Sequence, residues 1–571
     1  MKSSFLPRSR ILLCFFLLFV VILLTKLFLV QIVHSKFYSD SANRQYATPS
    51  QNLFERGTIY FQSKDGSLVS AATQASGFKV AINPTKLTSP ENSYKKLAEK
   101  VSLSREDFLA KAEKEGDPYE EVAFHLSQKD ADAVSALKIP GVSIFKEKWR
   151  LYPGEDLASH TLGLVAYKGD ELGGRYGLER QYNDELSRSG DSPYINFFAE
   201  VFSNINNKLF NGDKETGDIV TTIEPTVADF LEKKLSVVKS KYGADAIGGI
   251  IMDPRDGSIY ALSIKPDFNP NDFSQVKQAS TFSNPLVENV LEWGSVVKPL
   301  VMAAGLDTGV ISANTTYNDK GSVIVEKKEI FNFDKKGRGP GTSMQDVLSQ
   351  SLNTGMVFVE QKLGRDRLRE YLLSYGIDQK TGVDLPNETS GLVSNILKVK
   401  RELEYANASF GQGIALTPMA MIRALASLGN GGKLVVPHVV NKIKYDDGTE
   451  KKMEYETSQV KITPATGDEI TRMLVEVMDK ALKNGAAKME HYSVAVKTGT
   501  AQVANSVTGG YYEDRHTHSF FGYFPAYDPQ FVVLLYAVNP KGVLYASETW
   551  ADPFIEITKF LLNYYDVPPD R

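Results

Sequence analysis

The first strong pattern in the chain is a run of apolar positions near its N-terminus. Every residue from Ile11 to Leu24 is apolar, and the apolar character continues to Val33 with three polar interruptions. An α-helix needs roughly 20 mainly apolar residues to cross about 30 Å of hydrocarbon. Residues 11–33 are therefore predicted to form one transmembrane helix.

Charged residues around this run predict its orientation. Lys2, Arg8 and Arg10 precede the run, and no acidic residue occurs before Asp40. Positive charge beside a span stays on the cytoplasmic side. We therefore expect residues 1–10 to be a cytoplasmic tail and the remainder to lie outside, as a single-pass protein of the cytoplasmic (inner) membrane. A cleaved signal peptide is the alternative, but the run is long for one and no small-x-small cleavage site follows it.

Two larger regions follow, and they differ in pattern. Residues 34–240 combine charged, helix-compatible runs with short apolar segments and glycine-punctuated turns. Near 241–246 the pattern changes to a continuous apolar run, Ile247–Met252, then a turn and a second apolar segment, which predicts a β-hairpin. We expect an N-terminal α+β module over 34–240 and one large α/β unit over 241–571. Expected helices lie at 104–114, 127–137 and around 295–310, 343–375 and 417–430, and expected strands at 494–496, 518–524 and 531–538.

Composition excludes several classes of function. An apolar fraction of 42%, a charged fraction of 23% and a net charge of −4 indicate a globular protein with no electrostatic reason to bind nucleic acid. The single cysteine, Cys14, lies inside the apolar run, which excludes a disulfide framework and a cysteine-ligated metal. His516 and His518 could share a strand face as a metal pair, but no third ligand is apparent, so we interpret them as polar residues leading into a strand.

A candidate nucleophile occurs in the tetrapeptide Ser295-Val-Val-Lys298. On a helix, residues three apart share one face, so a hydroxyl and an amine come within reach of each other. The chain contains eight Ser-x-x-Lys matches, including an identical Ser236-Val-Val-Lys239, so context has to choose among them. Ser295 follows Trp293-Gly294 and precedes Lys298-Pro299, a turn entering a helix, whereas Ser236 lies in a charged amphipathic helix.

Two further elements complete the candidate site. Ser351-Leu-Asn353 lies in a predicted helical region, and Lys497-Thr-Gly499-Thr500 follows an alternating, strand-like segment. Each has a counterpart elsewhere, such as Lys380-Thr-Gly382 in a turn-rich loop, so the elements count only jointly.

The three elements in this order are the set found in penicillin-binding proteins and class A β-lactamases. Over nearly its whole length the chain resembles a class B penicillin-binding protein, a peptidoglycan D,D-transpeptidase of the cell-division or elongation type. The shared motifs outside the site are Arg56-Gly-Thr-Ile-Tyr60, Arg150-Leu-Tyr-Pro153, His160–Gly163, Gly177-Leu-Glu179 with Tyr182, Thr221-Thr-Ile-Glu224, Met252–Gly257, Phe410-Gly-Gln-Gly413 with Thr417-Pro418, and Lys497–Gln502.

The resemblance implies a fold and its boundaries. It implies an α/β (α+β) penicillin-binding/β-lactamase-like transpeptidase domain over 241–571, an N-terminal α+β pedestal or dimerisation module over 34–240, and the transmembrane helix. Two residues depart from the family pattern: Trp293 stands where proline is usual, and Leu352 where a small polar residue is usual.

The residue types also suggest a mechanism. A serine hydroxyl is a weak nucleophile near neutral pH and needs a base within reach. Lys298 can serve only when neutral, which requires lowering an amine pKa from about 10.4 by roughly three units, or some 4 kcal/mol. Burial and a second cation can lower it, and the resemblance implies that Lys497 is that cation. The implied remaining roles are proton relay for Ser351, orientation of the substrate amide for Asn353, contact with the substrate carboxylate for Thr498 and Thr500, and room for the substrate chain at Gly499.

The implied reaction is acyl transfer between peptidoglycan stem peptides. Ser295 would displace the terminal D-alanine of one stem and pass the acyl group to an amine of another; β-lactams would acylate the same serine, and no cofactor is needed. A separate membrane glycosyltransferase polymerase is the implied partner, and the motifs favour a role in division over lateral growth. The alternatives are a D,D-carboxypeptidase or β-lactamase-like hydrolase and a non-catalytic scaffold of the division machinery.

Overall fold

A computed structural model describes most of the chain beyond residue 54. The predicted cytoplasmic tail, 1–10, and most of the predicted span, 11–33, lie outside the described residues. Among the residues that are described, no helix is both long and apolar enough to cross a bilayer. The described residues are 18–20, 23, 25–26, 55–169, 171–188, 215–274, 276–505 and 509–571.

The chain forms two compact units, and the second is built from segments that are separated in the sequence. The described core of the first is 74–149, and the second combines 57–73, 150–187 and 215–571. Strand β2 (Leu68–Ile82) contributes to both, because its first residues pair with β1 (Ile59–Gln62) and its last residues with β3.

The first unit packs short helices on a small sheet. The end of β2 pairs with β3 (Glu120–Leu126), and β4 (Val142–Leu151) also pairs with β2. The predicted helices at 104–114 and 127–137 are confirmed as α4 (Arg105–Ala112) and α5 (Gln128–Ala136), and a serine side chain caps the first turn of each. With α3 (Pro90–Ala98), they enclose a separate apolar core.

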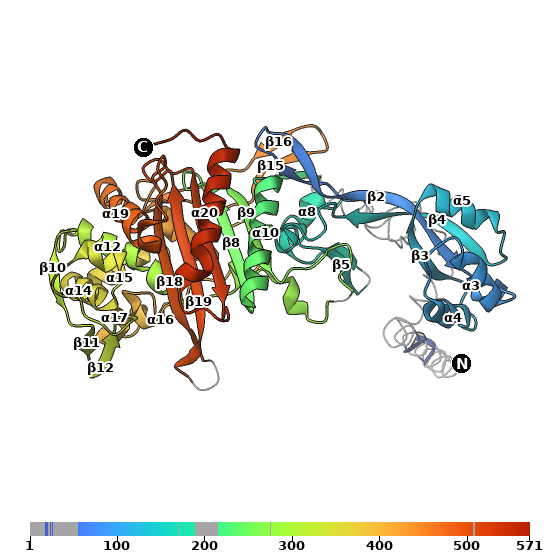
Figure 1. The fold of residues 1–571 in the computed structure, drawn as a ribbon. Coiled ribbons are helices and arrows are strands. Elements are labelled where there is room, and N and C mark those ends of the chain that lie inside the picture. Colours follow the sequence, from blue (N-terminus) through green and yellow to red (C-terminus); the bar gives the residue numbers. More distant parts are fainter. Residues whose placement is uncertain are drawn as a thin grey trace, which may run out of the picture. The chain divides into compact units, whose positions relative to one another are not determined.

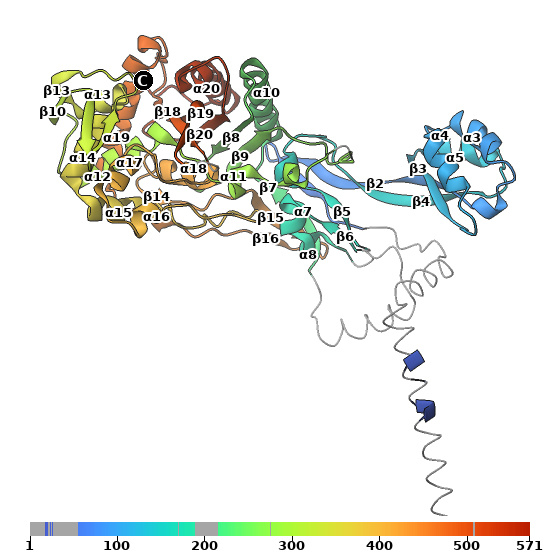
Figure 2. The same ribbon diagram turned by 90° about the horizontal axis from the view of Figure 1, so that it is seen from below.

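A five-stranded antiparallel sheet forms the centre of the second unit. Its order is β18-β19-β20-β8-β9, and α10 and α20 cover one face while α18 lies on the other (Figures 1 and 2). These elements are β18 (Ala495–Ala504), β19 (Tyr511–Phe524), β20 (Phe531–Val538), β8 (Ala246–Met252), β9 (Ile259–Lys265), α10 (Pro225–Tyr242), α18 (Pro418–Ala426) and α20 (Ala546–Tyr564).

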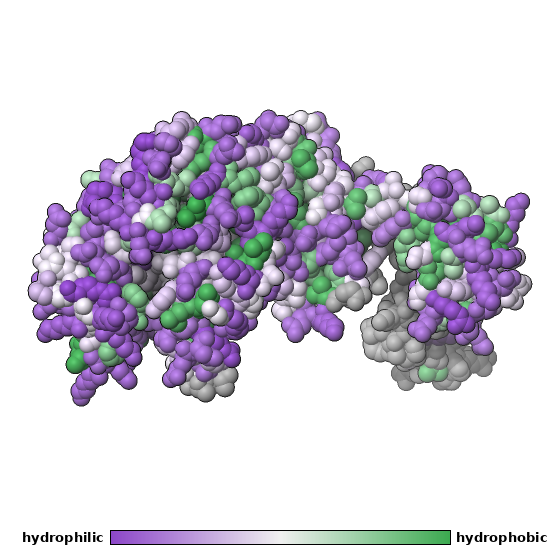
Figure 3. Space-filling model, viewed as in Figure 1, coloured by the Kyte–Doolittle hydropathy of each residue, from purple (hydrophilic) through white to green (hydrophobic). Residues whose placement is uncertain are grey.

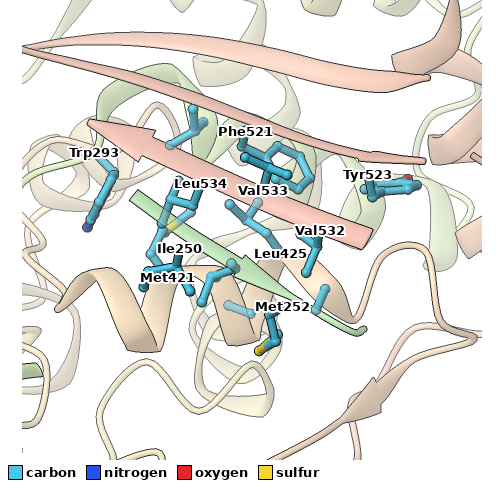
Figure 4. Packing of buried hydrophobic residues seen from close by; sticks show 14 of the residues in the cluster. Ile250, Met252, Trp293, Met421, Leu425, Phe521, Tyr523, Val532, Val533 and Leu534 are labelled. Carbon is cyan, nitrogen blue, oxygen red and sulfur yellow. The ribbon is translucent and has the colours of Figure 1, made fainter. Parts of the chain in front are cut away.

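The centre of this sheet is buried on both faces. Figure 4 shows Met421 and Leu425 of α18 beneath Ile250 of β8 and Val532 and Leu534 of β20. Burial on both sides explains why β20 is a continuous apolar run rather than an alternating one. The outer surface in Figure 3 is mainly hydrophilic by contrast.

Helices and short hairpins occupy the side of the sheet next to β18. The predicted helical stretch 343–375 is confirmed as α13 (Met344–Ser349), α14 (Asn353–Leu363) and α15 (Arg365–Ser374). Near them lie α12 (Lys298–Asp307), α16 (Ser394–Leu397), α17 (Glu402–Ala408), α19 (Pro464–Glu476), β10 (Thr316–Asp319), β11 (Ser322–Val325), β12 (Lys328–Phe331) and β13 (Gly339–Ser343).

A second sheet in this unit joins β1 and the start of β2 to β7 (Gly217–Thr221), β15 (Val440–Tyr445) and β16 (Glu450–Lys452). The remaining elements are short: α6 (Ser159–Leu162), β5 (Val165–Lys168), β6 (Glu171–Gly174), α7 (Gly177–Gln181), α8 (Asn183–Leu186), α11 (Pro285–Glu288), β14 (Lys433–Leu434) and β17 (Ser458–Gln459).

Candidate active site

The turn that carries Ser295 lies between strand β18 and a buried helix. Ser295 belongs to the 3-10 turn η4 (Gly294–Val296), and α12 begins three residues later. Gly294 has φ +56°, and a Cβ there would lie 3.0 Å from the carbonyl oxygen of Thr500. Glycine therefore permits both the left-handed turn and its close approach to β18. The structure leaves Ser295 half-buried at this junction.

Lys298 is fully buried, at 0% exposure, and its amine is held by three oxygen atoms. Its Nζ donates to the carbonyl oxygen of Ser351 at 2.6 Å and to Asn353 Oδ1 at 2.8 Å, and lies 3.3 Å from Ser351 Oγ. Ser351 has φ +57°, an uncommon conformation for a residue other than glycine and one that concentrates at functional sites. This strained residue thus points both of its oxygens at one amine.

Lys497 approaches the same hydroxyl from strand β18. Its Nζ donates to Ser351 Oγ at 2.9 Å and to the carbonyl oxygen of Thr498 at 3.0 Å. The amines of Lys298 and Lys497 therefore meet at one serine hydroxyl, next to the turn of Ser295. The structure brings together residues from all three sequence elements.

The rest of the Lys-Thr-Gly-Thr element lies on β18, the strand at one end of the sheet, next to the turn that carries Ser295. A Cβ at Gly499 would lie 2.6 Å from the carbonyl oxygen of Trp293, so the missing side chain makes room for the turn that carries Ser295. Thr498 and Thr500 are half-buried, and the Thr500 hydroxyl accepts a hydrogen bond from the amide of Ala546 at 3.1 Å. That hydroxyl keeps its own proton to donate to a ligand.

Burial changes the protonation of both lysines. The pKa of Lys298 is lowered well below its usual value, first by burial and then by the positive charge of Lys497. Burial also lowers the pKa of Lys497 to about 7. Two buried amines this close cannot both keep a proton easily, so the site favours a neutral Lys298.

Two departures from the family pattern have structural explanations. Trp293 is 1% exposed, donates its indole N–H to the carbonyl oxygen of Leu416 at 2.9 Å, and packs edge-on against Tyr536. Leu352 is buried at the start of α14 and offers no side-chain cap. The sequence prediction did not include the residue that replaces this cap, Asn332, whose Oδ1 accepts from the amide of Thr354 at 3.2 Å.

The rejected sequence matches lie away from this cluster. Ser236 is exposed on α10, on the side of the sheet opposite α18, and Lys380 is exposed in a loop. Among the described residues, neither the Ser236 hydroxyl nor the Lys380 amine forms a hydrogen bond with Ser351, whose partners are Lys298 and Lys497.

A possible metal site lies elsewhere and contains an amine. Among the described residues, the carboxylates of Asp156, Glu232 and Asp267 come close enough to share an ion. The ammonium group of Lys265 sits among them, 3.6 Å from Asp156, 3.4 Å from Glu232 and in contact with Asp267. His518 is not one of these groups; its Nδ1 lies 2.8 Å from the Thr549 hydroxyl.

The helix that carries Asn353 also contains an unusual acid, Glu360. Its side chain is fully buried, and neither carboxyl oxygen has a hydrogen-bond partner among the described residues. Burial, together with the nearby charge of Glu402, raises the pKa of Glu360 to about 8. A glutamate in the unfolded chain loses its proton near its ordinary pKa of 4.5. The free energy of unfolding is therefore expected to fall as pH rises from there through about 8.

Glu360→Gln is expected to remove this pH dependence. At pH 8.5 the variant is expected to be more stable than the wild type by roughly 2 kcal/mol, and at pH 5 to differ little. Urea unfolding at both pH values measures the difference. Glu456→Gln, the control at an exposed position, is expected to have the same free energy of unfolding as the wild type at both pH values. An equal effect of Glu360→Gln at the two pH values would contradict the prediction.

Comparison with known proteins addresses the family. The family model described as "Penicillin binding protein transpeptidase domain" matches residues 247–558, which is more than half of the chain. The chain belongs to the penicillin-binding proteins. A second model, "Penicillin-binding Protein dimerisation domain", matches residues 53–219. The predicted resemblance to the class B type is confirmed.

Relatives of this penicillin-binding protein match nearly its full length. Stage V sporulation protein D of Bacillus subtilis is 28% identical over 569 residues, covering 97% of this chain and 85% of the relative. Peptidoglycan D,D-transpeptidase FtsI of Buchnera aphidicola is 25% identical, covering 97% and 94%. Penicillin Binding Protein 2X of Streptococcus thermophilus shares the fold, with a TM-score of 0.71 at 21% identity, covering 90% of this chain and 81% of that one.

Proposed function

We propose that this penicillin-binding protein is a peptidoglycan D,D-transpeptidase that works through an acyl-enzyme on Ser295. The observation that carries the proposal is the meeting of two buried amines, those of Lys298 and Lys497, at Ser351 Oγ beside the Ser295 turn. Such a cluster can take a proton from one group and return it to another. The relatives named peptidoglycan D,D-transpeptidase FtsI and MrdA support this activity.

The hydrogen bonds of Lys298 suggest how the base is oriented. A neutral amine has two N–H groups and one lone pair. The carbonyl oxygen of Ser351 and Asn353 Oδ1 can take both N–H groups. The lone pair is then left for the hydroxyl of Ser295, which is the arrangement that general base catalysis requires.

The steps follow from these positions. Ser295 Oγ attacks the carbonyl carbon of the penultimate D-alanine while its proton passes to Lys298. Backbone N–H groups of Ser295 and Thr500 stabilise the oxyanion. Collapse of the intermediate breaks the peptide bond, and Ser351, bonded to both lysines, delivers a proton to the departing D-alanine amine. An amine of a second stem then attacks the ester, forming the cross-link and restoring Ser295.

The edge of β18 is proposed to hold the substrate carboxylate. The hydroxyls of Thr498 and Thr500 are half-exposed there, and Lys497 supplies positive charge nearby. β-Lactams carry a carboxylate and a strained amide, so they are expected to acylate Ser295. A solved relative of the same fold, penicillin binding protein 3 of Mycobacterium tuberculosis, is a complex with aztreonam (TM-score 0.69, 20% identity, covering 91% of this chain and 98% of that one).

The location and partners are also proposals. Residues 11–33 are proposed to anchor the protein in the cytoplasmic membrane with its N-terminus inside. Residues 34–240 would then form the pedestal and 241–571 the transpeptidase domain outside. A membrane glycosyltransferase polymerase is the proposed partner, since cross-linking needs newly made glycan strands.

Product analysis tests the proposed reaction. The full-length protein, in detergent, is incubated with a stem pentapeptide ending in D-Ala-D-Ala and an amine acceptor. We expect D-alanine release together with an acceptor-linked product, and prior treatment with penicillin is expected to stop both. Free tetrapeptide acid as the sole product would instead identify a hydrolase and contradict the proposal.

A further inference from the structure

A buried carboxylate lies behind the Ser351–Asn353 element. Asp319, at the end of β10, is 2% exposed. Its oxygens accept from the amides of Gly321 and Arg338, both at 3.0 Å, and from the Thr354 hydroxyl at 2.8 Å. The side-chain amide of Asn332 donates to both oxygens, at 3.1 and 3.0 Å. All of these donors are neutral. A buried carboxylate held in this way persists only when its hydrogen bonds are nearly complete.

Asn332 links this carboxylate to helix α14. Asn332 is 1% exposed, and while its Nδ2 donates to Asp319, its Oδ1 accepts from the amide of Thr354. Thr354 is the second residue of α14, so Asn332 satisfies one of the open N–H groups at the start of this helix. The N-terminal neighbour Leu352 cannot do so. Figures 1 and 2 show β10 and α14 side by side.

The residue before Asn332, Phe331, contacts the side chain of Asn353. The carbonyl oxygen of Phe331 accepts from Asn353 Nδ2 at 2.9 Å. Asn353 Oδ1 in turn accepts from Lys298 Nζ. If the side-chain amide of Asn353 were rotated by 180°, its oxygen would face the carbonyl oxygen of Phe331 and its NH2 group would face Lys298. Both hydrogen bonds would then be lost. The carbonyl of Phe331 therefore decides which end of Asn353 faces the amine.

We propose that Asp319 and Asn332 are positioning residues for the acylation step. They fix the Phe331 carbonyl and the first turn of α14, and through these they fix the orientation of Asn353 toward Lys298. Neither touches the substrate. The inference rests on the proposed function, because it concerns the geometry of the proposed base.

Asp319→Asn disrupts the network with little change in volume. Each oxygen of Asp319 accepts from at least two donors, so an NH2 group in either position faces at least two N–H or O–H groups instead of accepting from them. We expect the rate constant for acylation by a fluorescent penicillin to fall about tenfold to a hundredfold, as for other small misplacements of catalytic groups. The pre-acylation dissociation constant is expected to change by less than about threefold.

A double-mutant cycle distinguishes positioning from general loss of structure. If Asp319 acts through Asn353, Asp319→Asn is expected to add little to the effect of Asn353→Ala, because the shared interaction is already gone. Additive losses would overturn the proposal. Loss confined to the fraction of molecules that label, with the rate constant of the remainder unchanged, would do the same, since it indicates unfolding alone.

Two further variants keep the test valid should Asp319→Asn fold poorly. Thr354→Val removes one donor to Asp319 and is expected to slow acylation, whereas Thr354→Ser keeps the hydroxyl and is expected to restore it. Glu329→Gln, on the exposed face of the neighbouring hairpin, is the matched control and is expected to acylate like the wild type. Equal rates for Thr354→Val, Thr354→Ser and wild type would overturn the proposal. A wild type that does not label at all would instead overturn the proposed function.

Discussion

Ser295→Ala is expected to abolish covalent labelling by fluorescent penicillin. The variant lacks the only oxygen that can form the acyl-enzyme in this mechanism, so labelling is expected to fall by at least about a thousandfold. Ser351, although bonded to both lysines, is not expected to replace it, because its backbone is held at φ +57° with the hydroxyl directed at the amines. Gel fluorescence after denaturation measures the covalent adduct.

An identical tetrapeptide elsewhere in the chain provides the control. Ser236→Ala changes the first residue of Ser236-Val-Val-Lys239, which lies exposed on α10, and is expected to label like the wild type. Labelling that survives Ser295→Ala would show that another nucleophile reacts. If the wild type itself does not label, the non-catalytic scaffold becomes the better interpretation. The thermal midpoint of Ser295→Ala is expected to match that of the wild type, because a half-buried hydroxyl contributes little to stability.

Strands were predicted correctly where burial gives the sequence an apolar pattern, and they were missed where the residues are exposed and polar. The segment 531–538 coincides with β20, because a strand buried on both faces has an unbroken apolar run. The predicted strand at 518–524 covers only the second half of β19 (Tyr511–Phe524). Its first residues are mostly exposed and polar, and only pairing with β18 makes them a strand. Local sequence contains little information about such pairing.

Two of the three elements of the candidate site were identifiable because each has a local context. Lys497 follows an alternating segment and Ser295 stands at a turn before a helix, and both contexts appear in the structure. The Asp319–Asn332 network has no such context. Its members come from segments of short, mostly exposed strands, and aspartate and asparagine are ordinary turn residues. Their role depends on contacts between residues as far apart as 319 and 354, which a single sequence does not reveal.

Burial of the second amine changes how the base is understood. From the sequence, the low pKa of Lys298 was attributed to burial and to the charge of Lys497. In the structure burial is the larger cause for Lys298, and Lys497 is itself buried with a pKa of about 7. Near neutral pH the two amines are therefore not both fully protonated. Ser351 Oγ lies between them and is placed to move a proton from one to the other.

Lys298→Met is expected to reduce the acylation rate constant by at least about a thousandfold while the protein remains folded. Methionine is similar in length and suits a site with 0% exposure. The change removes the proposed base, so Ser295 would have to react as a neutral hydroxyl. It also leaves the carbonyl oxygen of Ser351 and Asn353 Oδ1 without this donor, which is expected to lower the thermal midpoint by only a few degrees. Stopped-flow acylation with a chromogenic β-lactam measures the rate constant.

Lys298→Arg distinguishes a base from a positive charge. Arginine keeps a charge and hydrogen-bond donors but does not lose its proton in proteins, since its pKa exceeds 12. If Lys298 acts as a base, Lys298→Arg is expected to be as slow as Lys298→Met. If the site needs only a cation at this position, the arginine variant would recover much of the rate, and the neutral amine would have no part in the mechanism. Lys239→Met, in the second Ser-Val-Val-Lys tetrapeptide, is expected to acylate at the wild-type rate because this amine lies on α10 and donates to the carbonyl oxygen of Ala244 at 3.0 Å.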